Sequence, residues 1–283
     1  MTVEAVLQGF VLSDKEFRLI SRLVNNYCGI KLNIGKKELV RARLAKHLRH
    51  GNFTTFSEYI EQVLNDKTGL EFSALIDSLS TNVTGFFREN QHFQFLQEKF
   101  LPSLIEKKTG KRDSRIRAWS AGCSSGEEAY SMAISLLGSL EGRGHWDIKV
   151  LATDISTRML TIAQTGTYSK ERVAPLNPQQ KQKYFLAKHI DGQTVYQVNE
   201  LLRDTVIFRH LNLIDSWPIE GPLDLIFCRN VMIYFDKPSQ RSLIQRFWDL
   251  LDSGGVLLTG HSESLVGVKH RFEFVQPSVY AKP

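Results

Sequence analysis

The chain has 283 residues, of which 42% are hydrophobic and 23% charged, as in ordinary globular proteins and unlike disordered ones. At about 150 residues per domain, this length predicts two domains with a sizeable core. Three scattered cysteines are too few for a disulfide framework or a zinc site, so we expect reduced thiols. The first residues lack the basic start of a secretion signal, and no apolar run reaches the roughly 18 residues of a membrane helix. We therefore expect a cytoplasmic protein without membrane insertion.

The net charge of +6 is distributed unevenly. Residues 36–50 (KKELVRARLAKHLRH) carry six Lys or Arg and one Glu, and residues 105–117 carry six against two acids. A basic segment confined to one helix indicates a particular acidic partner. On charge alone, a solvated helix face is an equally good interpretation.

The first 80 residues predict helices only. Apolar residues recur at helical spacing, with capping residues before them and glycines after them. We expect helices at 13–28, 36–50, 55–66 and 70–79. No strand alternates with them, so residues 1–88 are predicted to form a small all-α domain and its linker.

From residue 89 onward, the pattern changes to short apolar strands that alternate with helices, which is typical of a parallel sheet with crossover helices. We expect helices at 90–107, 127–140, 156–165 and 238–251, with strands at 116–119, 148–153, 223–228 and 256–260. A less regular insert at about 166–210 contains a predicted helix, 178–187, and two β-like stretches, 195–198 and 205–209. Residues 272–281 predict a final hairpin. Residues 89–283 therefore form the predicted α/β domain.

The first predicted strand leads into a turn of small residues, in the sequence WSAGCSSGEE at 119–128. Small residues let a ligand approach the backbone closely, although a purely structural turn is a serious alternative. Neither the dinucleotide-binding glycine pattern nor a P-loop is present. Two glutamates at the start of the next helix would repel phosphate, so the turn favours a ligand with positive charge.

An acid, Asp154, ends the second predicted strand. In doubly wound sheets an acid at this place typically accepts hydrogen bonds from ribose hydroxyls. Taken alone, Asp154 is more often the N-cap of the next helix. Together with the preceding turn, it favours a nucleoside cofactor. Since no phosphate-binding feature is present, S-adenosylmethionine is a better interpretation than NAD or ATP.

Two further polar segments lie where ligands bind in such folds. Arg229 and Asn230 follow the strand at 223–228, where an ordinary cap is the alternative. Asn230 is not followed by the Pro-Pro-aromatic sequence of enzymes that methylate amino groups of nucleic acids. Residues 80–89 (STNVTGFFRE) lie between the two predicted domains, and their density of polar side chains exceeds what a helix start needs.

Four motifs in order resemble the CheR family, the methyltransferases that esterify glutamates of chemotaxis receptors with S-adenosylmethionine. They are TNVTGFFRE at 81–89, WSAGCSSGEE at 119–128, FCRNVMIYFD at 227–236 and GHSES at 260–264. The resemblance covers nearly the whole chain. It implies a small all-α domain, followed by a class I (Rossmann-like) methyltransferase domain with a small antiparallel β-subdomain inserted at about 166–210.

The resemblance also implies a set of cofactor contacts. They are Asn82, Thr84, Arg88, Glu128, Asp154, Asn212, Leu213, Arg229 and Asn230. Asp154 would hold the ribose hydroxyls, Asn212 and Leu213 would lie along the adenine, and Arg88 would lie near the methionyl carboxylate. Glu128 rather than Glu127 is assigned by alignment.

The reacting methyl group is expected near Arg229, Asn230 and Tyr234. A glutamate, with a pKa of about 4.3, is already ionised at neutral pH, so the reaction needs no general base. We therefore name no catalytic acid or base. No metal is predicted either. His261 is expected to be a structural histidine.

The implied partners are glutamate-rich receptor helices, which the basic segment complements in charge. Its cations are Lys36, Lys37, Arg41, Arg43, Lys46 and Arg49. No nucleic-acid partner is expected, and the protein is predicted to be a monomer. Two rival hypotheses are an S-adenosylmethionine-binding adaptor without turnover and a nucleic-acid methyltransferase that uses the basic helix on phosphates. The sequence leaves open which receptor is the substrate and whether the β-subdomain docks a receptor tail.

Overall fold

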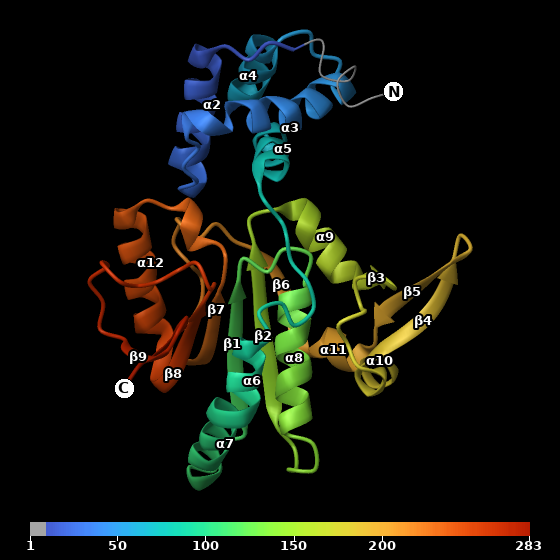
Figure 1. Ribbon diagram of the computed structural model, residues 1–283, viewed down its shortest axis with the longest axis vertical. Helices are drawn as coiled ribbons and strands as arrows, with labels where there is room; N and C mark the ends of the chain where they lie inside the picture. Colours follow the sequence, from blue (N-terminus) through green and yellow to red (C-terminus); the bar gives the residue numbers. More distant parts are fainter. Residues whose placement is uncertain (1–9) are drawn as a thin grey trace.

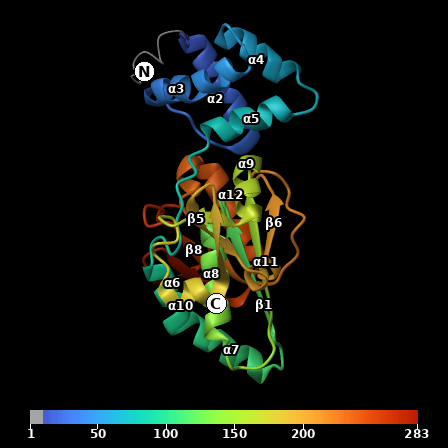
Figure 2. The ribbon, with the colours of Figure 1, turned by 90° about the vertical axis from the view of Figure 1, so that its right-hand side faces the viewer.

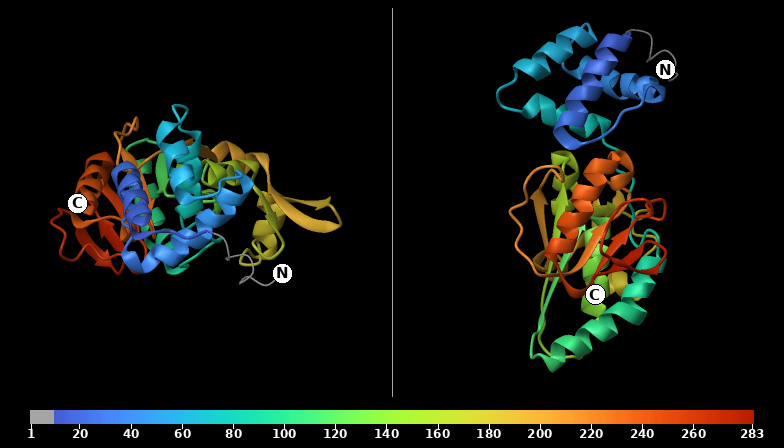
Figure 3. Two further views of the ribbon diagram at one scale, coloured as in Figure 1. Left: turned by 90° about the horizontal axis from the view of Figure 1, so that it is seen from above. Right: turned by 90° about the vertical axis from the view of Figure 1, so that its left-hand side faces the viewer.

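The computed structural model describes residues 10–283, and it separates a helical domain from an α/β domain (Figure 1). Figures 2 and 3 show the helical domain stacked on one end of the α/β domain. The four predicted helices are confirmed. They are α2 (Asp14–Cys28), α3 (Lys37–His50), α4 (Phe56–Asn65) and α5 (Leu70–Leu79), with a 3₁₀ turn, η1 (Ile34–Lys36), before α3.

Local signals set the ends of the first helix. The Ser13 side chain accepts from the Glu16 backbone N–H, and Glu16 bonds back to Ser13, which makes a capping box. Gly29 ends the helix in the left-handed conformation, at φ 73°. The buried side of α2, with Phe17, Ile20 and Val24, joins those of α3, α4 and α5 in a core of its own.

A seven-stranded sheet forms the centre of the second domain, in the order β6-β2-β1-β7-β8-β10-β9. The first five strands in this order are parallel, and the last two are antiparallel, so the predicted terminal hairpin is confirmed. The strands are β1 (Arg115–Ala121), β2 (Asp147–Asp154), β6 (Val206–His210), β7 (Leu223–Cys228), β8 (Leu251–Thr259), β9 (Glu273–Gln276) and β10 (Val279–Ala281).

Helices cover both faces of this sheet, because alternate strand residues face opposite sides. Ala118 and Leu225 pack with α8 on one face, whereas Trp119 and Ile226 pack with α12 on the other. The predicted helix 90–107 is three consecutive segments with a π-helical turn in the middle. The helices of this domain are α6 (Gln91–Phe95), η2 (Leu96–Phe100), α7 (Leu101–Gly110), α8 (Glu127–Ser139), α9 (Thr157–Thr165), α11 (Glu200–Thr205), η3 (Met232–Tyr234) and α12 (Lys237–Leu250).

The insert differs from the prediction at two places. A three-stranded antiparallel sheet contains β3 (Thr167–Ser169), β5 (Gln193–Val198) and β4 (Phe185–Ile190). The helix predicted at 178–187 ends as α10 (Pro178–Tyr184), because its last residues begin β4.

The stretch predicted at 205–209 is β6, which pairs with β2 in the central sheet and not with the insert. Strand propensity indicates an extended segment but does not say which sheet receives it, so the predicted limit of 210 was wrong. The β4–β5 hairpin projects away from the central sheet (Figure 1).

Candidate active site

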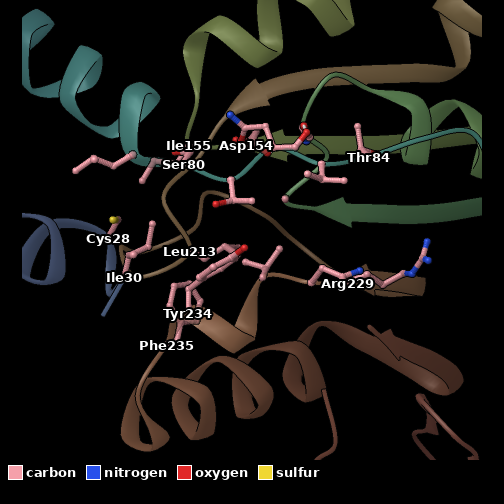
Figure 4. Close-up of a pocket in the computed structure, with 18 of the residues that line it drawn as sticks. Cys28, Ile30, Ser80, Thr84, Asp154, Ile155, Leu213, Arg229, Tyr234 and Phe235 are labelled. Atoms are coloured by element: carbon pink, nitrogen blue, oxygen red, sulfur yellow. Dashed lines mark hydrogen bonds between the residues drawn. The ribbon is translucent and has the colours of Figure 1, made fainter. Parts of the chain in front are cut away.

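A cleft of about 1230 Å³, including the solvent at its mouth, lies between the helical domain and the central sheet. Residues that follow β1, β2, β6 and β7 line it, as expected where parallel strands end at a common edge. Figure 4 shows Asp154, Thr84 and Arg229 around one part of it, with Cys28 and Ile30 of the helical domain at the other end. The structure brings together all nine predicted cofactor residues and Tyr234 in this lining: Asn82, Thr84, Arg88, Glu128, Asp154, Asn212, Leu213, Arg229, Asn230 and Tyr234.

The turn after β1 brings bare backbone to the cleft. Gly122 has φ 94°, and a Cβ there would lie 2.4 Å from Val231 Cγ2. Glycine therefore allows this turn to approach the segment after β7. Ser124, also on the turn, donates from its hydroxyl to the Asn82 carbonyl at 3.1 Å. This bond joins the turn to residues 80–89, the linker between the two domains.

Asp154 lies at the end of β2 and is buried. Its two oxygens accept from the backbone N–H groups of Ser124, at 2.7 Å, and Ser156, at 2.8 Å. Ser156 caps α9 with its own hydroxyl, so Asp154 is not the N-cap. Burial raises the pKa of Asp154, and the two backbone donors oppose this shift. Each carboxylate oxygen retains a lone pair, so the group can still accept hydrogen bonds from ligand hydroxyls.

A buried guanidinium, that of Arg229, joins three segments of the site. Its Nη1 lies 3.1 Å from Glu128 Oε2, and its Nη2 lies 2.9 Å from Glu89 Oε2. The same Nη2 donates to the Arg88 carbonyl at 2.5 Å. Burial raises the pKa of Glu128, although the charge of Arg229 acts to lower it. Burial also acts to raise the pKa of Glu89, but the hydrogen bond and charge of Arg229 hold that pKa below its usual range.

The two adjacent glutamates face different partners. Glu128 lines the cleft and accepts from the Ser120 hydroxyl at 2.7 Å. Glu127 is fully buried, pairs with Arg172 of the insert and accepts from the Ser125 hydroxyl at 2.9 Å. The geometry therefore favours Glu128 as the cleft residue.

Apolar residues form the wall beyond β6. Leu211 and Leu213 are buried and lie beside Ile155 in the lining. The Asn212 amide donates to the Tyr27 carbonyl of the helical domain at 2.6 Å, and its oxygen accepts from the Ile214 N–H at 3.2 Å. Asn212 thus connects the two domains as well as lining the cleft.

The basic helix reaches the same cleft as the predicted cofactor residues. Lys36 and Arg43 are part of the lining. Arg43 donates from Nη1 to the Leu79 carbonyl at 2.6 Å and from Nη2 to the Thr81 hydroxyl at 3.3 Å. Leu39 is 46% exposed and also lines the cleft. The sequence did not show this, because the packing of α3 against the linker is a tertiary contact.

The other predicted cations differ in their surroundings. Lys37 pairs with Asp14 at 2.5 Å, and Arg41 pairs with Glu38 at 2.8 Å. Lys46 and Arg49 are exposed near the end of α3. Lys36 lies over the Tyr234 ring, with its Nζ 5.6 Å from the ring centroid.

Sequence reasoning missed Glu263, a buried acid that follows β8. Its Oε2 accepts from the backbone N–H groups of Asn230 and Gly260, each at 2.7 Å, and its Oε1 accepts from Ile233 at 3.1 Å. Asn230 has a positive φ of 61°, so this carboxylate holds a strained backbone in place beside Arg229. The motif at 260–264 contains this acid, but its residue type alone does not indicate the backbone donors that it meets after folding.

The donor set suits S-adenosylmethionine. A carboxylate with spare lone pairs follows β2, leucines flank the cleft after β6, and Arg88 offers a guanidinium for a carboxylate. The carboxylates of Asp154 and Glu128 line the cleft and would repel a phosphate. A parallel sheet with these groups at its carboxyl edge defines the class of nucleoside-cofactor methyltransferases with a Rossmann-like fold.

Comparison with known proteins names the family. Residues 82–281 match the model described as the CheR methyltransferase, SAM binding domain, and residues 15–80 match the CheR all-alpha domain. The chain belongs to the CheR methyltransferase family, and S-adenosylmethionine is its cofactor. Within residues 10–283, no helix is both long and apolar enough to cross a membrane.

Three relatives match over nearly their whole length. A chemotaxis protein methyltransferase of Borreliella burgdorferi is 42% identical, covering 96% of this chain and 95% of the relative. That of Escherichia coli is 39% identical, over 95% of this chain and 91% of the relative. A probable chemotaxis protein methyltransferase of Rhizobium etli is 38% identical, over 91% of this chain and 96% of the relative.

Replacing Glu263 tests its role in the fold of the site. E263A leaves three backbone donors without their acceptor, so we expect the free energy of unfolding to fall by at least about 1–3 kcal/mol. Urea denaturation measures this change. E273A, at an exposed position on β9, is the control and should stay within about 0.5 kcal/mol of the wild type. Equal unfolding curves for both variants would contradict the role.

Proposed function

We propose that this chain methylates glutamate side chains of chemotaxis receptors and forms glutamate methyl esters. The names of its relatives and the family's S-adenosylmethionine-binding domain support this proposal. One structural observation supports an acidic substrate in particular. Lys36 and Arg43 of the basic helix line the same cleft as Asp154 and Arg229, so a carboxylate that enters the cleft meets positive charge.

We propose for these residues the cofactor roles that the family resemblance implies, and their place in the lining of one cleft supports the proposal. Asp154 accepts from the ribose hydroxyls, and Leu213 and Asn212 lie along the adenine. Arg88 pairs with the methionyl carboxylate, since a guanidinium can bind a carboxylate bidentately. Asn82 and Thr84 line the side of the cleft that the linker forms and would contact the cofactor there. Glu128 lies where the positively charged part of the ligand would bind. Arg229, Asn230 and Tyr234 lie near the methyl group.

The reaction needs alignment more than proton transfer. S-adenosylmethionine, when bound, supplies an activated methyl group. The attacking carboxylate oxygen is already ionised at neutral pH, so the protein needs no general base. The Glu89–Arg229–Glu128 network fixes the segment after β7, whose residues would lie near the methyl group of the bound cofactor. The surrounding cleft removes water from the carboxylate, which makes it a better nucleophile.

Incubation with labelled S-adenosylmethionine tests the function. With receptor-bearing membranes we expect methyl label that alkali releases, as it does from esters. An adaptor that only binds S-adenosylmethionine would leave no label on the receptors or on added RNA. Alkali-stable label on added RNA, with none on the receptors, would support a nucleic-acid methyltransferase instead.

The role of Asp154 has its own test. D154A should weaken the affinity for S-adenosylhomocysteine by about 1–3 kcal/mol, because it removes the acceptor of buried hydrogen bonds. Calorimetry measures the affinity, and the thermal midpoint reports whether the turn at Ser124 is still folded. D191A, at an exposed position in the β4–β5 hairpin, is the matched control and should bind normally. Unchanged affinity of a folded D154A protein would remove Asp154 from the site.

We also propose that α3 binds the glutamate-rich receptor helices. The six cations named above supply the charge, but Arg43 and Lys36 lie in the cleft, and a change at either would disturb it. Lys46 and Arg49 are exposed at the end of α3 and are not part of the cleft lining, so changes there leave the cleft residues in place.

Reversing the charge of Lys46 and Arg49 tests this surface. K46E with R49E should raise the apparent KM for the receptor and flatten its salt dependence, because exposed charges act mainly on encounter and are screened over about 8 Å. Affinity for S-adenosylhomocysteine should not change. K111E with R112E changes the net charge equally, at an exposed place beyond α7, and should leave KM unaltered. Equal KM for both double variants at low salt would contradict the proposal.

We propose further that the protein acts in the cytoplasm. Its three cysteines are buried and unpaired, which fits a reducing compartment. The expectation of a monomer stays a prediction.

A further inference from the structure

Three side chains with metal-binding atoms lie together beside the cleft. Glu89 ends the linker, His92 lies on α6, and His261 follows β8. One ligand atom from each lies within 4.8 Å of those from the other two. None of the three was assigned a role toward S-adenosylmethionine, and only folding brings the segment after β8 to the linker.

His92 is the unusual member of this cluster. Its side chain is 1% exposed, and neither ring nitrogen has a hydrogen-bond partner. Nδ1 lies 3.6 Å from Glu89 Oε2, and the ring centroid lies 5.0 Å from that of His261. Burying polar atoms without partners is costly, so a buried imidazole in this state calls for a ligand.

Packing alone does not explain the residue. The His92 ring contacts Phe227 edge-on, with centroids 6.3 Å apart, and Phe93 also packs on Phe227. A phenylalanine at position 92 would serve such an aromatic cluster without burying two nitrogens. The imidazole atoms therefore point to a function beyond packing.

The nearby guanidinium of Arg229 is the main charge that opposes a cation here, because it bonds the same carboxylate. However, two carboxylates pair with it, those of Glu89 and Glu128. The local carboxylates thus outnumber the guanidinium. His261 is exposed, which gives an ion a path from solvent.

We propose that Glu89, His92 and His261 bind a transition-metal ion such as Zn²⁺ and that this ion competes with Arg229 for Glu89. Two imidazoles and one carboxylate are a ligand set for Zn²⁺, whereas Mg²⁺ and Ca²⁺ prefer oxygen ligands alone. Glu89 also accepts from the Asn230 amide at 3.2 Å. A metal that draws Glu89 away therefore loosens both Arg229 and Asn230, and it weakens cofactor binding.

Calorimetry of the untagged full chain with Zn²⁺, and absorption of bound Co²⁺, test the site. We expect one ion per chain. H261A should weaken Zn²⁺ binding at least about tenfold, since even outer-shell partners of a metal contribute 10–100-fold. His261 is exposed, so this variant avoids the folding defect that replacing buried His92 invites, and its thermal midpoint checks this. H189A, which removes an exposed histidine on β4, is the control and should bind Zn²⁺ normally.

The coupling between Zn²⁺ binding and cofactor binding has a separate measurement. Saturating Zn²⁺ should lower the affinity of the wild type for S-adenosylhomocysteine, and S-adenosylhomocysteine should weaken Zn²⁺ by the same factor. In H261A, the same Zn²⁺ concentration should have no such effect. Equal Zn²⁺ affinity in H261A and wild type would overturn the site. Zn²⁺ binding that leaves S-adenosylhomocysteine affinity unchanged would overturn the competition with Arg229.

Discussion

The buried guanidinium of Arg229 is the charge on which the arrangement of the site depends. Its side chain is 2% exposed, and it pairs with Glu128 at the start of α8 and with Glu89 at the end of the linker. A buried charge is costly without partners, and the meeting of these three segments supplies them. The rings of Phe93 and Phe227 lie 5.7 Å and 5.4 Å from the guanidinium carbon and exclude water from the network. The linker is held against the sheet edge as a result.

The linker in turn places the helical domain over the cleft. Arg43 of α3 donates to the Leu79 carbonyl, and Asn212 beyond β6 donates to the Tyr27 carbonyl. The α/β domain therefore contributes the carboxylates and apolar walls that suit a nucleoside, while the helical domain contributes cations. Both sets line one space, so under the proposed function an acidic substrate and the cofactor share it. Substitutions in the first half of α3 should change the binding of both.

The insert is attached to the turn after β1 and to the start of α8. Tyr168 donates from its hydroxyl to the Ser125 carbonyl at 2.7 Å, and Arg172 pairs with the fully buried Glu127. The adjacent glutamates at the start of α8 thus serve two neighbours, with Glu127 toward the insert and Glu128 toward the cleft. The β4–β5 hairpin extends outward from this attachment (Figure 1).

The sequence by itself determined the elements and the chemistry of the site. Capping residues and apolar periodicity are local signals, so the helix Asp14–Cys28 and the parallel strands could be predicted. Residues that follow parallel strands must share one edge, which is why Asp154 and Arg229 could be assigned to a common cleft. Only the tertiary structure decided that residues 206–210 join the central sheet, since strand pairing depends on distant residues. It also showed that α3 lines the cleft and that Glu263 holds Asn230, because both contacts join segments far apart in the chain.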